Sequence, residues 1–159
     1  MLDKGERFYI GTTRFNNFTY KENMEWREKH KWTGCIYGCN KKMPLNVPHL
    51  AIVYVIEMNN DENKIMGIGA IRNYINLDHK VCIYKSDTNY NRYIYNSGIR
   101  KDRVDINKHL LLALELVVFK GYGHFKRGQG ISIIPWKRFG KSGKDIYELF
   151  NNLFTINKG

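Results

Sequence analysis

One segment of the chain, residues 120–144, combines the residue types that bind nucleic acid. It holds seven Lys and Arg and no Asp or Glu. Glycines and aromatic residues recur between the charges: Gly121, Tyr122, Gly123, Phe125, Gly128, Gly130, Trp136, Phe139, Gly140 and Gly143. Free backbone N–H groups and Lys or Arg side chains suit phosphate oxygens, and aromatic faces suit unstacked bases. The segment therefore predicts a nucleic-acid-binding loop with these candidate contacts: Lys126, Arg127, Gln129, Lys137 and Arg138.

One alternative to this prediction is a solvated basic loop whose aromatic residues anchor it to the core. If instead it binds nucleic acid, the basic surface would extend to Arg92, Arg100 and Lys101, provided that the fold brings them near.

Two tryptophans near the start of the chain, Trp26 and Trp32, are candidates for an aromatic cage, with Tyr37 just beyond them. Two aromatic walls stabilise a flat or methylated ring between them, and the ring quadrupole adds to this when the ligand is cationic. The alternative is that both indoles belong to the core. Trp26 stands among charged residues, which favours an exposed position. Trp136, inside the basic segment, is a further candidate wall.

Three cysteines and one histidine could hold zinc, since Cys35, Cys39, His79 and Cys82 offer three thiolates and an imidazole. Their spacing matches no known zinc knuckle. Buried free cysteines are the alternative, and we predict neither a metal nor a cofactor. An odd number of cysteines is also unlike a secreted disulfide scaffold and favours a reducing, intracellular compartment.

Acid–base chemistry has only two candidates, Glu57 and His124. The Gly128-x-Gly130 pair is too short for a dinucleotide fingerprint. We therefore expect a binding module rather than an enzyme, and predict no catalytic residues.

Hydrophobic periodicity predicts the elements that must position these groups. Helices are expected over residues 21–30, 105–119 and 144–154, the second with Asp105 as N-cap and Gly121 just past its end. Strands are expected over residues 7–10, 34–39, 49–58, 64–74, 80–85, 89–96 and 131–134. Residues 49–58 and 64–74 should pair as a hairpin. Gly67 and Gly69 would then leave a slot on one face for a ligand or a backbone, or mark a bulge or close packing contact.

The composition limits the classes of protein. The chain has 159 residues, 43% of them hydrophobic, and a net charge of +11. This size and apolar content fit a single domain, residues 1–159, and exclude a disordered tail. No apolar run is long enough for a membrane span, and we expect no signal peptide. The frequent Lys, Asn, Ile and Tyr also suit an AT-rich genome, so part of the charge needs no function.

The element order predicts an α+β fold, with a curved mixed sheet or a small barrel flanked by helices. Residues 7–75 resemble the PUA-like superfamily, in particular its EVE, ASCH and YTH branches. The resemblance lies in a helix leading into Trp32-Thr33-Gly34, then Asn40, then a hairpin ending in Gly67-Ile68-Gly69. The second half resembles, loosely, uncharacterised proteins of large DNA viruses.

The resemblance implies a pocket for a modified base, with Trp32 as one wall, Asn40 at the base edge and Trp26 or Trp136 as the second wall. Together with the basic loop it predicts an RNA-binding module, RNA being favoured over DNA, that recognises a methylated base or a capped 5′ end. Two alternatives stay open: a viral structural or interaction protein that binds nucleic acid without specificity, and a small nuclease. The expected location is intracellular, or the viral factory or virion for a viral protein; no membrane partner is expected, and the oligomeric state is open.

Overall fold

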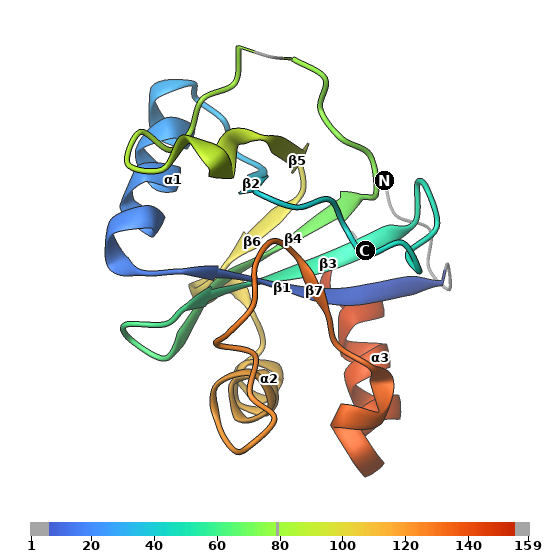
Figure 1. Cartoon of the computed structure of the whole chain (residues 1–159). Helices are drawn as coiled ribbons and strands as arrows, with labels where there is room; N and C mark the ends of the chain where they lie inside the picture. Colours follow the sequence, from blue (N-terminus) through green and yellow to red (C-terminus); the bar gives the residue numbers. More distant parts are fainter. Residues whose placement is uncertain (1–6, 79, 155–159) are drawn as a thin grey trace, which may run out of the picture.

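A five-stranded mixed sheet runs through the middle of the protein (Figure 1), whose computed structural model describes residues 7–78 and 80–154. The strands are β1 (Phe8–Phe15), β2 (Cys35–Cys39), β3 (Ile52–Asn59), β4 (Lys64–Arg72), β5 (Tyr93–Ser97), β6 (Arg100–Asp102) and β7 (Ser132–Ile133). The α-helices are α1 (Asn17–Lys29), α2 (Lys108–Phe119) and α3 (Gly143–Leu153), and short 3-10 helices cover Thr88–Asn91, Arg103–Asp105 and Trp136–Ser142. The predicted α+β class is confirmed.

The sheet has the strand order β6-β4-β3-β1-β7, and β2 pairs with β5 in a separate two-stranded sheet. Only β1 and β3 run parallel; the other pairs are antiparallel. Within the described residues the large sheet stays open between its edge strands β6 and β7, so the barrel alternative is wrong. No helix in this part of the chain is long and apolar enough to span a membrane.

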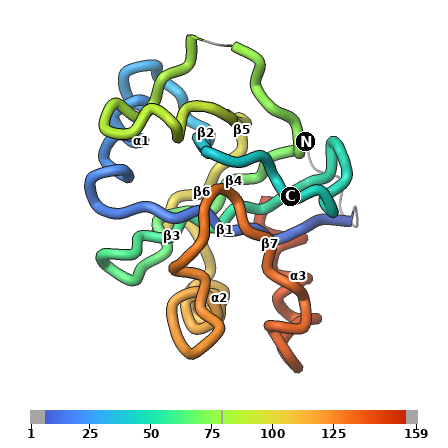
Figure 2. The backbone as a smooth tube through the Cα atoms, in the orientation of Figure 1, coloured from blue at the N-terminus to red at the C-terminus, as the bar shows by residue number. Residues whose placement is uncertain are grey.

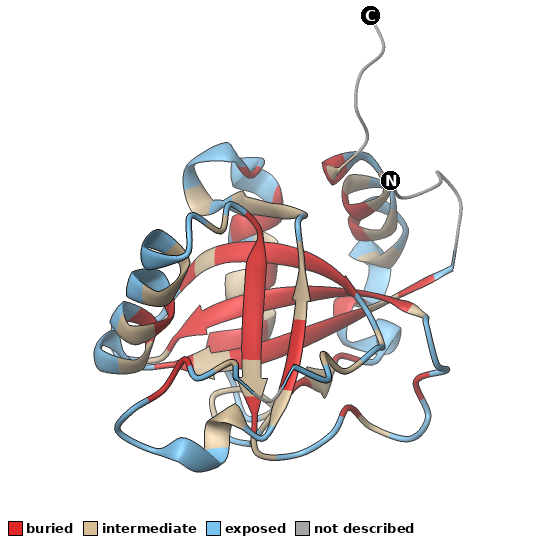
Figure 3. Ribbon diagram, turned by 90° about the horizontal axis from the view of Figure 1, so that it is seen from above, coloured by how far each residue is buried: buried red, intermediate tan, exposed pale blue. Residues whose placement is uncertain are grey.

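Two layers cover the sheet, one on each face. On one face α2 and α3 enclose an apolar cluster around Ile10, Tyr54 and Phe150, and on the other α1 and the two-stranded sheet enclose a second around Tyr37 and Val55. Because both faces are covered, every residue of β3 is buried, as the red strands of Figure 3 show. The predicted hairpin is confirmed as β3 and β4.

Capping side chains fix where the helices begin. Asn16 caps α1 by accepting the backbone N–H of Thr19, so the helix starts four residues before the predicted range. Asn107, not Asp105, caps α2 by accepting from the N–H of His109. Gly121 follows α2 with a positive φ of 80°, as predicted for its position.

The predicted strand over residues 80–85 is wrong. The side chain of Asn91 accepts the N–H groups of Ile83 and Tyr84 at 2.8 and 2.9 Å, and this takes the donors that a strand would use in a ladder. Asn91 itself lies in the 3-10 helix at Thr88–Asn91, so only the second half of the predicted strand 89–96 forms, as β5.

Side chains of this protein fill the slot predicted at Gly67 and Gly69. A Cβ at Gly69 would lie 2.3 Å from the Tyr37 hydroxyl, and one at Gly67 would lie 2.5 Å from Arg100 Nη2. The missing side chains therefore serve close packing inside the protein, and the slot offers no room for a ligand.

Candidate functional site

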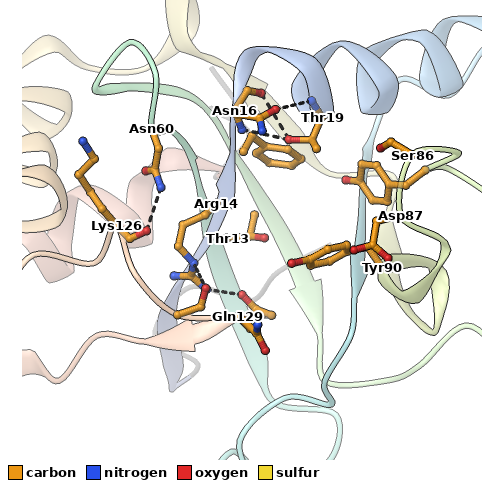
Figure 4. Close-up of a pocket in the computed structure, with 15 residues that line it drawn as sticks. Thr13, Arg14, Asn16, Thr19, Asn60, Ser86, Asp87, Tyr90, Lys126 and Gln129 are labelled. Carbon is orange, nitrogen blue, oxygen red and sulfur yellow. Dashed lines mark hydrogen bonds between the residues drawn. The ribbon is translucent and has the colours of Figure 1, made fainter.

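A pocket of about 350 Å³ lies where the C-terminal end of β1 turns into α1 (Figure 4). Four further parts of the chain enclose it: Gly38 of β2, the β3–β4 turn, residues 84–90, and the loop at 126–130 from the predicted basic segment. Its lining residues are Thr13, Arg14, Phe15, Asn16, Thr19, Gly38, Asn60, Tyr84, Ser86, Asp87, Tyr90, Lys126, Gly128, Gln129 and Gly130.

Arg14 of β1 holds the basic loop in place. Its guanidinium donates to the carbonyl oxygens of Phe125 and Gly128, at 3.3 and 3.1 Å, and to that of Gly130. It also donates to the hydroxyl groups of Thr12 and Ser132. Burial lowers the pKa of Arg14, yet the ordinary arginine pKa is so high that the group stays charged. Arg14 is thus committed to the protein itself and shapes the loop rather than offering its charge to a ligand.

One backbone donor of the loop, the N–H of Gln129, has no partner among the described residues. A trans peptide points its N–H opposite to its C=O, so the Gln129 N–H points away from Arg14, and no hydrogen bond of the described residues uses it. Positive φ values at Gly128 and Gly130, 120° and 69°, let the backbone turn in this way. Two side chains brace the loop from outside: Asn40 donates to Gln129 Oε1 at 3.0 Å, and Asn60 donates to the Lys126 carbonyl at 2.9 Å.

Tyrosines from residues 84–90 form the wall opposite the loop. Tyr84 is buried and its hydroxyl accepts from Asn23 at 3.2 Å, while Tyr90 is half-buried and meets Tyr84 edge-on at 6.4 Å. In Figure 4 the Tyr90 ring points across the pocket towards Thr13. Gly38 makes this wall possible, because a Cβ there would lie 2.2 Å from the Tyr90 carbonyl oxygen.

Charge is distributed unevenly across the pocket. Lys126 stands on one side, and Asp87 on the other. Asp87 is the one carboxylate among the described residues that line the pocket; one of its oxygens accepts the Asn89 N–H at 3.1 Å. The charges therefore favour an anion at the loop, and N–H donors or a positive charge at the tyrosine wall.

The predicted tryptophan walls lie elsewhere. The pocket meets the first residues of α1, and Trp26 stands ten residues beyond its N-cap, about 15 Å along the helix. There Trp26 stacks on His30 with ring centroids 4.1 Å apart. Trp32 donates its indole N–H to the Cys35 carbonyl at 3.0 Å and lines a separate depression beside Lys31.

The other end of the basic segment lies on the opposite face of the sheet. Trp136 packs against Phe8 and Tyr147, at 5.7 and 5.6 Å between ring centroids, in the layer of α3. Arg138 donates to the Gly123 carbonyl, and Lys137 is exposed beside it. Of the predicted contact residues, the fold brings together Asn40, Lys126 and Gln129, with Arg127 exposed between the last two, and leaves Lys137 and Arg138 apart.

Glu57 and Arg100 form a buried ion pair, which removes both from the candidate surface. The side chains are 3% and 7% exposed, and two bonds of 2.9 and 2.8 Å join the guanidinium to the carboxylate. Tyr37 also donates to Glu57 at 2.7 Å, and burial followed by the Glu57 charge raises the pKa of Tyr37 well above its ordinary value. Burial alone would lower the pKa of Arg100, but the Glu57 hydrogen bonds and charge raise it.

The remaining predicted residues serve local structure. His124 Nδ1 accepts the Lys126 N–H at 3.2 Å within the loop, and Lys101 lies on the edge strand β6.

The four zinc candidates differ in their surroundings. Cys35 and Cys39 are buried and Cys82 is exposed; His79 lies outside the described residues. Burial raises the pKa of Cys35 to about 11 and of Cys39 to about 12, so both stay thiols. Across residues 7–78 and 80–154 no three metal-ligating side chains come together.

The sequence analysis did not predict the tyrosine wall or the hydrogen bonds by which Arg14 holds the loop. The wall was hidden by the expectation of a strand over residues 80–85. The bonds of Arg14 had no signal in the sequence, because the predicted strand ended at residue 10 whereas β1 runs to Phe15. Comparison of the chain with protein-family models, curated proteins and solved structures finds no match.

Proposed function

We propose that this protein binds single-stranded RNA by taking one base into the pocket between Tyr90 and the loop at residues 126–130. One observation carries the proposal: a basic, glycine-containing loop and an aromatic wall face each other across a 350 Å³ space. The likeness to the PUA-like superfamily is consistent with a base pocket, but the walls differ from those that the likeness implied.

The loop is the phosphate side of the site. Lys126 and Arg127 supply charge, and the Gln129 N–H supplies a directional donor. Arg14 fixes the loop before any ligand arrives, so binding needs little ordering of the backbone. Phosphate contacts of this kind position a nucleic acid without reading its sequence.

The tyrosine wall is the base side. Tyr90 offers a ring for stacking, which contributes about 1–3 kcal/mol per base. Asp87 accepts N–H groups from a base edge and favours a ring that carries positive charge. Of the two ligands considered, an internal methylated base or a capped 5′ end, the carboxylate favours the positively charged methylated purine of a cap.

The test is the affinity of a fluorescently labelled ten-nucleotide RNA, measured by anisotropy, for three forms of the protein. We expect Tyr90→Ala to weaken binding about tenfold, the loss of one stacked base. The matched variant Trp32→Ala should change the affinity less than twofold, because Trp32 lines a different depression. Affinity should also fall steeply as the salt concentration rises.

Three results would oppose the proposal: affinity equal in Tyr90→Ala and the unmodified protein, a large loss in Trp32→Ala alone, or no binding at low salt. If only the salt dependence is seen, the protein binds nucleic acid without a base pocket. Where Tyr90→Ala does weaken binding, two comparisons separate an internal methylated base from a capped 5′ end. The first compares RNA with and without a methylated base, and the second uses a free cap analogue as competitor.

A further inference from the structure

A second aromatic ring lies next to the pocket, on the side where the basic loop ends. Tyr93 opens β5 and stands opposite Cys39 in the β2–β5 pair. The chain that leaves β2 continues through Asn40 and Lys41 to Lys42, whose amine lies over this ring. We infer that the bound RNA continues from the pocket along this segment and stacks a second base on Tyr93. The inference rests on the proposed function.

Contacts within the protein make the two sites continuous. Asn40 bonds to Gln129 of the pocket loop at 3.0 Å. The backbone of Gly130 lies against Lys41, whose carbonyl oxygen would be 3.5 Å from a Cβ at position 130. In Figure 2 the loop rises past the sheet to meet the segment that follows β2. The pocket loop and the segment after β2 are therefore in direct contact, and this segment continues to Lys42.

The surroundings of Tyr93 suit a stacked nucleotide. Lys42 Nζ and Arg92 Cζ each lie 5.7 Å from the centre of its ring, which is half-buried. Both cations are exposed, and neither forms an ion pair with any described residue. Two unneutralised cations beside one half-buried aromatic ring are the combination that tracks a phosphate backbone while a base stacks.

The spacing of the two rings sets the length of the ligand. Tyr90 and Tyr93 are three residues apart, at the change from the 3-10 helix Thr88–Asn91 to β5. Three residues span about 6–10 Å in these conformations. Tyr90 lines the pocket and Tyr93 does not, so a base held in the pocket stacks on Tyr90 alone and the second site should act only on ligands longer than one nucleotide.

The experiment compares a nucleoside monophosphate with a ribohexanucleotide, both titrated by NMR, which can measure weak affinities. Tyr93→Ala should weaken the hexanucleotide about fivefold and leave the affinity of the mononucleotide within twofold, whereas Tyr90→Ala should weaken both. Tyr93→Phe should bind like the unmodified protein, because the ring and not the hydroxyl stacks. Tyr74→Ala removes an exposed tyrosine beside His49 and serves as the control.

The failures of the two proposals differ. If Tyr90→Ala weakens both ligands and Tyr93→Ala weakens neither, the second site is wrong and the pocket stands. An equal loss for both ligands in Tyr93→Ala also overturns the length-dependent second site. If the unmodified protein binds neither ligand, both proposals are wrong.

Discussion

Replacing Glu57 by glutamine is expected to lower the free energy of unfolding by about 3–5 kcal/mol, as measured by urea denaturation. The carboxylate accepts two bonds from Arg100 and one from Tyr37, and it is 3% exposed. Without its charge, the buried guanidinium of Arg100 keeps only the half-exposed carboxylate of Asp102, at 3.2 Å, as an ionic partner. A charge in such a place costs far more than the loss of an ordinary hydrogen bond.

Two further variants test whether the loss of stability comes from the buried charge of Arg100 or from the removal of any carboxylate. Glu25→Gln removes an exposed partner of Lys21, at 3.7 Å, and should change stability by less than about 1 kcal/mol. The double variant Glu57→Leu with Arg100→Met removes both charges and should be more stable than Glu57→Gln alone. A Glu57→Gln protein as stable as Glu25→Gln would show that the pair is not a buried charge network.

Replacing Arg14 by methionine is expected to remove about 3 kcal/mol of stability and to weaken RNA binding more than Tyr90→Ala does. Methionine keeps much of the apolar stem but leaves the carbonyls of Phe125, Gly128 and Gly130 without their donor. The loop then loses the arrangement that presents its N–H groups and Lys126. Amide hydrogen exchange should show faster exchange across residues 125–132, and anisotropy should show the weaker binding.

Arg138→Met is the matched control, because Arg138 gives the same segment a single bond, to Gly123. It should cost less than about 1 kcal/mol and leave exchange at residues 128–132 unchanged. If Arg14→Met and Arg138→Met behave alike, Arg14 does not organise the loop.

Elements with strong local patterns could be predicted from the sequence. Residues 49–58 and 64–74 form the expected hairpin because an apolar, β-branched run on each side of a polar turn has few alternatives. Residues 80–85 look equally strand-like in composition. There the Asn91 side chain takes the N–H groups of Ile83 and Tyr84, a contact that no periodicity records.

The candidate site could be predicted only in the part whose pattern is local in the sequence. The composition of the loop is local, and Lys126 and Gln129 do line the pocket. Which aromatic residues face that loop depends on packing. Trp26 stands on the same helix whose first turn borders the pocket, yet the helix carries it away. Tyr90 reaches the pocket only because Gly38 lets its segment lie against β2.

The most direct test of the central claim is to find where a base touches the protein. The protein is photo-crosslinked to a short RNA that contains 4-thiouridine, and the crosslinked peptides are identified by mass spectrometry. A base held between the tyrosine wall and the basic loop predicts crosslinks within residues 84–93 and 126–130. Crosslinks confined to residues 26–32 or to residues 136–138 would contradict it.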